Sequence, residues 1–279
     1  MDFVLTCGTS QTEKLSKFKN VLGLDLESIG YPELQNHFSS EPDPSLDEGF
    51  LNDSETPIEE ISKSIKNYIN NPENKQTIID LEKPEENNPL GAELSTLYHY
   101  FLENDISPEN HRFHILRSDT YEGWFNALVL SKVIIKTEWG TVGNNTEPHN
   151  VVGLRENPNQ TEKPLLNLVC VLNTILYILI EKDKKQVPVQ VPVLVMSGGF
   201  KSTIPCLTVY SLVFALQLVY LFEKSAKLNY LQPVVNLENI EKYQIFWKQL
   251  LEMKTVNHME WFHEILKFKD QVAIPWISG

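Results

Sequence analysis

The chain has 279 residues, with 24 lysine and arginine residues against 37 aspartate and glutamate residues, which gives a net charge of −13 at pH 7. General binding to long DNA or RNA needs a strongly basic surface, so no long nucleic acid is expected as a partner. Hydrophobic residues make up 42% of the chain, enough for the core of one large domain with or without an appendage.

The chain begins with an apolar strand that ends in a small polar turn. Residues Phe3 to Cys7 are predicted to form a buried strand, and a helix is predicted from Gln11 to Leu22. The turn between them, Gly8-Thr9-Ser10, carries two hydroxyl groups. Such a turn between strand and helix is typical of the ligand-binding edge of an open α/β sheet. The alternative is that Thr9 or Ser10 merely caps the helix.

The next segment has a different composition. From about Gly30 to Ser54, prolines, serines and acidic residues predict a surface excursion with short helical pieces. Thr56 is predicted to cap a helix that has Pro57 at its first position and runs to about Asn70. Thr77 to Leu81 is a candidate strand.

A second polar turn follows a later predicted strand, in the middle of the chain. Leu90 to Leu102 is predicted as a helix, and His111 to Arg117 as a strand that ends in Ser118-Asp119-Thr120. A long helix should follow, from Tyr121 to about Thr137. Asp119 has two interpretations, as the cap of that helix or as a contact to a ribose or an amine at the sheet edge.

The most apolar run, Leu165 to Ile180, lies within a predicted helix from Leu165 to Lys182. It is shorter than the ~20 residues of a membrane span and contains polar residues, so a buried helix is expected and no membrane partner. Neither is a signal peptide expected at the N-terminus, which lacks a basic region. The three cysteines, which lie in apolar segments, are expected to be buried thiols of a reducing, cytoplasmic compartment: Cys7, Cys170 and Cys206.

A glycine-rich turn lies late in the chain. A predicted strand from Val187 to Met196 ends in Ser197-Gly198-Gly199-Phe200-Lys201, and a helix is predicted from Thr203 to Leu216, followed by a strand from Leu218 to Phe222. Glycines allow close approach of the backbone to an anion, a helix N-terminus offers free N–H groups, and Lys201 adds a positive charge. This pattern favours a phosphate site. The alternative is a tight turn with a solvated lysine.

Alternating strands and helices predict an α/β fold, a Rossmann-like open and mainly parallel sheet with helices on both faces. We expect a ligand-binding domain over residues 1–235, with an acidic insertion around 30–55, and a C-terminal helical extension over 236–279 that packs on the sheet domain or on a second copy. A dinucleotide-dependent oxidoreductase fits this fold, but Gly-x-Gly-x-x-Gly does not follow the first strand.

Four segments, in order, resemble motifs of the CARF domains, the CRISPR-associated Rossmann-fold sensors. They are Leu5 to Ser10, Gly91 to Leu97, Leu116 to Gly123 and Met196 to Lys201. The resemblance covers about residues 1–235. It implies a homodimer that binds a cyclic oligoadenylate across its two subunits, with cyclic tetra-adenylate favoured over cyclic hexa-adenylate. By motif, the ligand-binding residues are Gly8, Thr9, Ser10, Ser118, Asp119, Thr120, Ser197, Gly198, Gly199, Phe200 and Lys201.

Many members of that family carry an effector ribonuclease with an Arg-x4-His motif. None of the arginines here, which are Arg112, Arg117 and Arg155, has a histidine five residues later. The chain is therefore most similar to a stand-alone ring nuclease, which binds the ring and cleaves it without metal or other cofactor, switching off type III CRISPR signalling. The resemblance implies Ser10 and Lys201 as catalytic residues. The alternative is a non-catalytic sensor that signals through its C-terminal helices to a partner.

Overall fold

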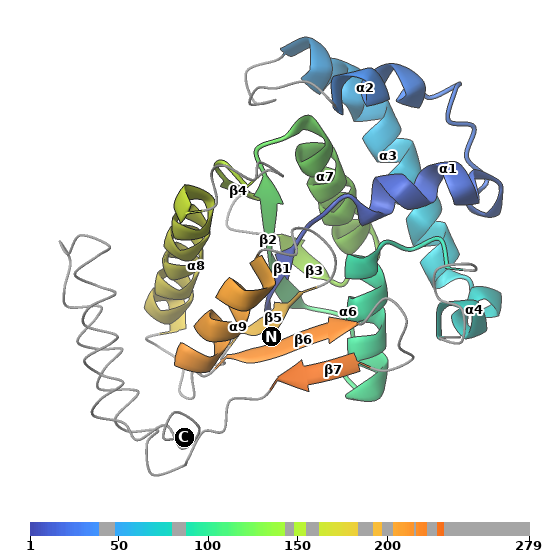
Figure 1. Cartoon of the computed structure of the whole chain (residues 1–279). Coiled ribbons are helices and arrows are strands. Elements are labelled where there is room, and N and C mark those ends of the chain that lie inside the picture. Colours follow the sequence, from blue (N-terminus) through green and yellow to red (C-terminus); the bar gives the residue numbers. More distant parts are fainter. Residues whose placement is uncertain are drawn as a thin grey trace, which may run out of the picture.

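The computed structural model describes residues 1–38, 48–79, 88–142, 148–154, 162–183, 192–196, 203–214, 216–221 and 228–231. Within these ranges the strands form one open sheet in the order β3-β2-β1-β5-β6-β7, and β4 also pairs with β2 (Figure 1). All pairings are parallel except the one between β6 and β7. This confirms the predicted α/β fold with a mainly parallel sheet. The strands are β1 (Asp2–Thr6), β2 (His111–Ser118), β3 (Gly140–Val142), β4 (His149–Val151), β5 (Val193–Val195), β6 (Gln217–Leu221) and β7 (Leu228–Leu231).

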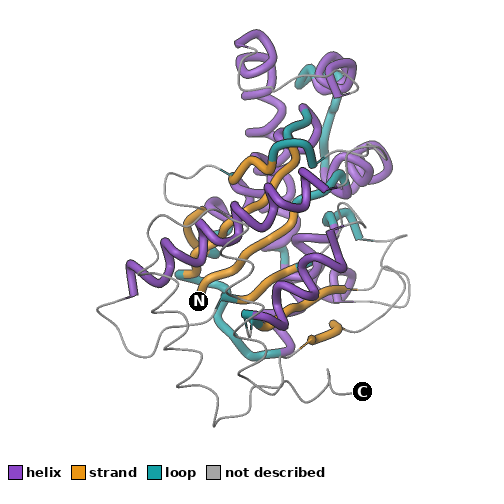
Figure 2. Tube along the Cα trace, turned by 60° about the vertical axis from the view of Figure 1, so that its left-hand side comes forward, coloured by secondary structure: helices purple, strands orange, loops and turns teal. Residues whose placement is uncertain are grey.

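Helices cover both faces of the sheet, and the strands run through the middle of the molecule (Figure 2). The first group packs around one face and the second around the other, as the two separate core clusters show. The first group is α1 (Ser10–Leu22), α2 (Tyr31–Phe38), α3 (Glu48–Asn70), a 3-10 turn (Pro72–Asn74), α4 (Lys75–Ile79), α6 (Ala92–Glu103) and α7 (Tyr121–Lys136). The second group is α8 (Glu162–Asp183) and α9 (Thr203–Val213).

The central strand β1 contributes side chains to both cores. Phe3 and Leu5 point into the larger cluster, and Val4 points into the cluster of α8 and α9. Successive side chains of a strand alternate between the two faces, so a strand covered on both sides must be apolar throughout. Phe3 stacks on Phe113 of the neighbouring strand, with ring centroids 5.2 Å apart. This explains why the apolar run near the N-terminus predicts a strand correctly.

The helix predicted to begin at Thr56 begins instead at Glu48, and Pro57 lies inside it. An internal proline costs a helix ~3 kcal/mol or more, because it removes one hydrogen bond and crowds the preceding turn. The extension buries Phe50, which is 1% exposed and lies against Tyr121 and Trp124 of α7, with ring centroids 4.5 and 5.4 Å away. A fully buried aromatic side chain with two ring contacts contributes a comparable free energy. Part of the expected irregular excursion is thus regular helix.

The strand predicted at Thr77 to Leu81 is also wrong, because Lys75 to Ile79 form the short helix α4. The preceding Asn71 accepts a hydrogen bond from the Glu73 N–H, and Pro72 follows it at the first position of the 3-10 turn. This local start signal outweighs the β-branched residues of the segment, and the buried Ile78 anchors the helix. Residues 187–191, the first half of the strand predicted over Val187 to Met196, and the extension 236–279 lie outside the described residues.

The cysteines differ in burial. Cys7 is 6% exposed, as predicted, whereas Cys170 and Cys206 are only partly buried. Both lie on helices α8 and α9, whose apolar residues extend beyond the face that contacts the sheet. An apolar neighbourhood in the sequence therefore did not guarantee burial there.

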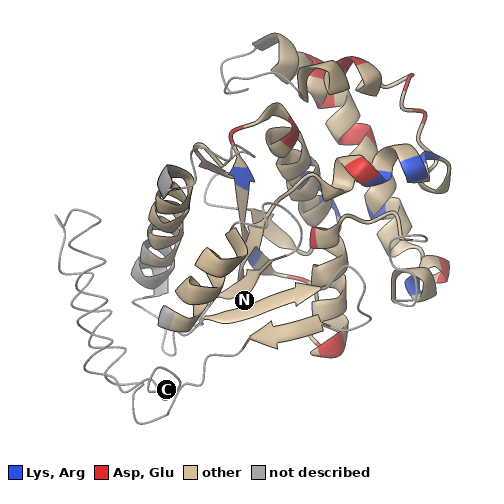
Figure 3. Ribbon diagram, in the orientation of Figure 1, with Lys and Arg blue, Asp and Glu red and all other residues tan. Residues whose placement is uncertain are grey.

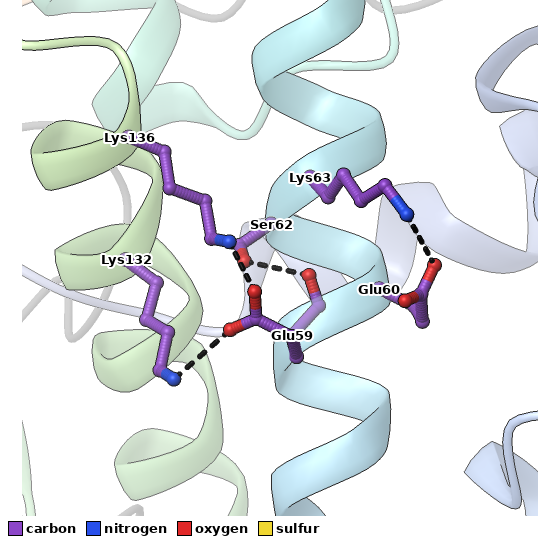
Figure 4. Close-up of polar contacts among 6 residues, drawn as sticks. All are labelled: Glu59, Glu60, Ser62, Lys63, Lys132 and Lys136. Carbon is purple, nitrogen blue, oxygen red and sulfur yellow. Dashed lines mark hydrogen bonds and ion pairs between the residues drawn. The ribbon is translucent and has the colours of Figure 1, made fainter.

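Helices α3 and α7 are joined by an ion-pair cluster on their shared flank (Figure 4). The Glu59 carboxylate of α3 accepts from Lys136 Nζ and, at 3.0 Å, from Lys132 Nζ, both on α7. These hydrogen bonds, with that of Lys136 the stronger, lower the pKa of Glu59. The adjacent Glu60 pairs only within its own helix, with Lys63 at 3.5 Å.

We therefore predict that Glu59→Gln lowers the free energy of unfolding by about 0.5–1 kcal/mol at pH 7, since both groups are partly solvated and screened. Glu60→Gln, the matched control, should change it by less than about 0.3 kcal/mol. The pKa of Glu59 is lower in the folded state than in the unfolded state. Its contribution to the free energy of unfolding is therefore fully present above the unfolded pKa of about 4.3 and is lost as pH falls through the folded pKa. In urea unfolding between pH 7 and pH 3, the difference in the free energy of unfolding between the parent and Glu59→Gln should become smaller as the pH falls. Equal effects of the two substitutions at pH 7 would contradict this.

Candidate functional site

The carboxyl ends of three neighbouring strands meet at one edge of the sheet. Strand β1 lies between β2 and β5, with Thr6 opposite Leu116 and Leu5 opposite Val195. The chain order reverses at β1, and ligands of open α/β sheets bind in the crevice at such a point. The turn after β1 and the turn after β2 therefore share this edge, as predicted. The third predicted turn lies outside the described residues and comprises Ser197, Gly198, Gly199, Phe200 and Lys201.

The two hydroxyl groups of the first turn do not cap helix α1. Thr9 occupies the N-cap position, but its side chain accepts no capping bond and donates to Glu13 Oε1 at 2.9 Å. Ser10 is the first helical residue, and its hydroxyl donates to Glu93 Oε2 at 2.5 Å. The structure thus directs both hydroxyl protons to carboxylates, one exposed and one buried.

Glu93 is a residue of this edge that sequence reasoning did not single out. It lies in the first turn of α6, is 4% exposed, and accepts from the Gly8 N–H at 2.9 Å through its second oxygen. The Ala92 N–H of the same turn donates to Ser10 Oγ at 3.0 Å. Burial raises the pKa of Glu93, while the hydrogen bonds from Gly8 and Ser10 oppose that shift. The signal in the sequence was the acidic residue after Gly91 in a segment already noted for its resemblance.

The close approach of α6 to α1 requires glycine at position 91. A methyl group there would lie 2.9 Å from Ser10 Oγ and 3.0 Å from Gln11 Oε1. The Gly91 N–H donates to that Gln11 oxygen at 2.8 Å, and Gln11 Nε2 donates to the Pro89 carbonyl at 3.3 Å. The amide of Gln11 thus joins the two helix starts without using a charge.

The second turn is organised by its own hydroxyl pair. Ser118 Oγ and Thr120 Oγ1 lie 2.8 Å apart, and Thr120 caps α7 by accepting from the Gly123 N–H at 3.1 Å. The cap interpretation of Asp119 is therefore wrong, because Thr120 holds that position. Asp119 Oδ2 instead accepts from the Gly153 N–H at 3.0 Å, in the turn after β4. A methyl group at Gly123 would lie 2.0 Å from Ser118 Oγ, so the turn leaves no space for a side chain there.

The two turns are linked through α1 and α7. The Thr12 N–H donates to Asn126 Oδ1 at 3.0 Å, and the Thr12 hydroxyl lies 2.6 Å from Glu122 Oε1. Arg117, at the end of β2, is buried and donates to the Ser118 carbonyl at 3.0 Å and to Asn150 Oδ1 at 3.3 Å. Cys7 is a buried free thiol, and burial raises its pKa well above the usual value, which disfavours the thiolate form.

Charged residues are unevenly distributed over the described part of the fold (Figure 3). Acidic side chains surround the first turn of α1, where three hydroxyl groups each face a different glutamate. Helix α9 and strands β5 to β7 contain no lysine, arginine, aspartate or glutamate. An anionic group is therefore disfavoured at the first turn itself, and a phosphate at this edge requires positive charge from elsewhere.

In the part of the chain that the structure describes, no helix has both the length and the apolar content of a membrane span. Among the same residues, no group of three histidine, cysteine, aspartate or glutamate side chains is arranged to hold a metal ion. No curated protein matches the sequence.

A family model described as CRISPR-associated protein (Cas_APE2256) matches residues 88–234, which is more than half of the chain. The match runs from the residues just before α6, through the second turn and the glycine-rich segment, to just beyond β7. The chain therefore belongs to this family of CRISPR-associated proteins.

Proposed function

We propose that this protein binds a cyclic oligoadenylate, with cyclic tetra-adenylate the favoured ring, across a homodimer and cleaves it to linear di-adenylates. Its membership of a CRISPR-associated family supports this, because such rings are the messengers of type III CRISPR systems. The observation that carries the proposal is the fixed Ser10 hydroxyl at the reversal point of the sheet, held by Glu93 and the Ala92 N–H. Two of the CARF-like segments, Leu5 to Ser10 and Leu116 to Gly123, contain the turns that follow β1 and β2 at this edge, which also supports the proposal.

The reaction needs little from the protein beyond orientation. One linkage per subunit is cut. There the 2′-oxygen of an adenosine attacks the phosphorus of its own 3′-phosphate, the bond from that phosphorus to the 5′-oxygen of the next nucleotide breaks, and a 2′,3′-cyclic phosphate forms, so that two cuts convert cyclic tetra-adenylate to two linear di-adenylates. The 2′-hydroxyl gives its proton to water, and the leaving 5′-oxygen takes one from water. Holding the 2′-oxygen in line with the leaving oxygen contributes roughly 7–11 kcal/mol in well-oriented intramolecular reactions. Ser10 orients the reacting nucleotide in this proposal, and Lys201 stabilises the charge that develops on the phosphate.

The direct test is to incubate the purified protein with labelled cyclic tetra- and hexa-adenylate in EDTA and to separate the products. Conversion to linear di-adenylates with cyclic phosphate ends supports a ring nuclease. A ring that is bound but not cut supports the sensor instead. Failure to bind either ring would overturn the proposal.

Ser10→Ala should slow cleavage about 10- to 100-fold and weaken binding of the ring only about 3- to 5-fold, because orientation acts mainly on the transition state. Lys201→Ala should slow cleavage about 100- to 1000-fold, since it removes a fixed donor from a developing anion. Single-turnover rates and equilibrium binding separate these effects. Ser28→Ala and Lys19→Ala are controls away from the sheet edge and should behave as the parent. Parent-like cleavage by either site variant would remove that residue from the site.

A homodimer is part of the proposal, and helix α9 offers a suitable surface. It begins two residues after Lys201 and carries an apolar stripe of Pro205, Val209 and Leu212, of which Pro205 and Val209 are exposed, Val209 to 58%, and Leu212 is partly buried. Residues spaced by three and four positions share one face of a helix. A second copy seated there would bring the two glycine-rich segments close together.

Val209→Glu should therefore convert a dimer largely to a monomer and weaken ring binding about 10-fold or more, because a charge would be buried without a partner. Val21→Glu is the matched control, since Val21 is 56% exposed on α1 in the charged half of the molecule. Light scattering after size-exclusion chromatography gives the mass. A dimeric Val209→Glu variant would show that α9 is not the interface.

A further inference from the structure

The hydrogen bonds at Ser10 have a defined direction. A serine hydroxyl has one proton to donate and two lone pairs that accept. The proton is directed to Glu93 Oε2 at 2.5 Å, and the Ala92 N–H occupies one lone pair at 3.0 Å. With respect to the residues that the structure describes, one acceptor position remains at Ser10 Oγ. The ligand group that meets Ser10 must therefore be a donor.

Glu93 is held as the acceptor of this pair. Its other oxygen receives the Gly8 N–H at 2.9 Å, so donors reach both oxygens of the carboxylate. It also lies in the first turn of α6, where free N–H groups and the helix dipole favour a negative charge. An ionised carboxylate can only accept hydrogen bonds. While Glu93 is ionised, Ser10 must therefore be the donor in the hydrogen bond between them.

A purely structural role does not account for Glu93. The starts of α1 and α6 are already joined by Gln11, which accepts from the Gly91 N–H and donates to the Pro89 carbonyl. Burying a carboxylate costs free energy that this neutral amide avoids. The charge has an effect that the amide cannot supply, namely that it sets the direction of the Ser10 hydrogen bond.

We propose that Glu93 is a positioning residue that fixes Ser10 as a hydrogen-bond acceptor, so that Ser10 Oγ receives the ribose 2′-hydroxyl of the ring and not its phosphate. This rests on the proposed function and decides which part of the nucleotide meets the first turn. A phosphate oxygen offers no proton to Ser10 and would be repelled by Glu93. The site would therefore select rings made of ribonucleotides over 2′-deoxy rings.

The test variant is Glu93→Gln, which is close to the parent in size. Its amide oxygen can still accept from the Gly8 N–H, while its NH₂ group donates to Ser10 and releases the serine proton toward the ligand. The probes are cyclic tetra-adenylate and its all-2′-deoxy analogue, with binding measured by calorimetry. The parent should bind the ribose ring about 10-fold more tightly than the deoxy ring, as expected for the loss of one or two hydrogen bonds.

Glu93→Gln and Ser10→Ala should each reduce this preference to about 3-fold or less, and the double variant should show no further loss, because the two residues act as one unit. The kcat for the ribose ring should fall about 10-fold or more in Glu93→Gln, while KM rises only about 3- to 5-fold. Glu93→Asp, which keeps the charge, should retain part of both the preference and the rate. Glu122→Gln is the control for the loss of a neighbouring carboxylate, since Glu122 Oε1 lies 2.6 Å from the hydroxyl of Thr12, which can also donate to the Thr9 carbonyl at 2.7 Å. It should keep the parent's preference.

An unchanged preference for the ribose ring in Glu93→Gln would overturn the proposal. A purely structural role would instead weaken the binding of both rings equally and lower the melting temperature, and that result would overturn the proposal as well. If Glu93→Gln does not fold, an unchanged preference in Ser10→Ala overturns it instead. A parent that binds both rings equally overturns this inference alone. A parent that binds neither ring overturns the proposed function, and this inference with it.

Discussion

The burial of β1 on both faces and along both edges is the constraint on which the rest of the structure depends. A central parallel strand has no solvated side, so helices must cover Phe3 and Leu5 on one face and Val4 on the other. From β1 the chain builds the sheet outward to β2 and β3 on one side, and then returns to add β5 and β6 on the other side. The carboxyl end of β1 therefore opens into a crevice, and the turn from Gly8 to Ser10 has to lie there.

Elements with a strong apolar period could be predicted from the sequence, and weakly buried or short ones could not. The strand at His111–Ser118 and the helices at Ala92–Glu103 and Tyr121–Lys136 were predicted to within about two residues, because each buries a continuous face. Strands β3 and β7 were not predicted, since most of their few residues are only partly buried. Helix α3 shows the opposite case, in which a distant contact of Phe50 overrides the local signal of Pro57.

The candidate site could be predicted only as far as its local parts. The hydroxyl turn that contains Ser10 was identified from its place after a strand, which is local information. Its partner Glu93 lies 83 residues further along the chain, and nothing in the sequence states that the two meet. Asp119 was the residue predicted for the cap of α7, and the structure gives that position to the adjacent Thr120, whose hydroxyl lies 2.8 Å from Ser118 Oγ.

The direction of the hydrogen bonds at the sheet edge suggests how the work is divided between the turns. The hydroxyls of the first turn face carboxylates, so that turn suits a neutral donor such as a ribose hydroxyl. Arg117 is already engaged with Ser118 and Asn150. In our proposal, the phosphate of the ring is therefore assigned to Lys201. Neighbouring strands lie about 4.8 Å apart, and β1 and β5 are neighbours. A 2′-hydroxyl and its own 3′-phosphate are a few ångströms apart as well, so in the proposed complex a single nucleotide is large enough to span the ends of these two strands.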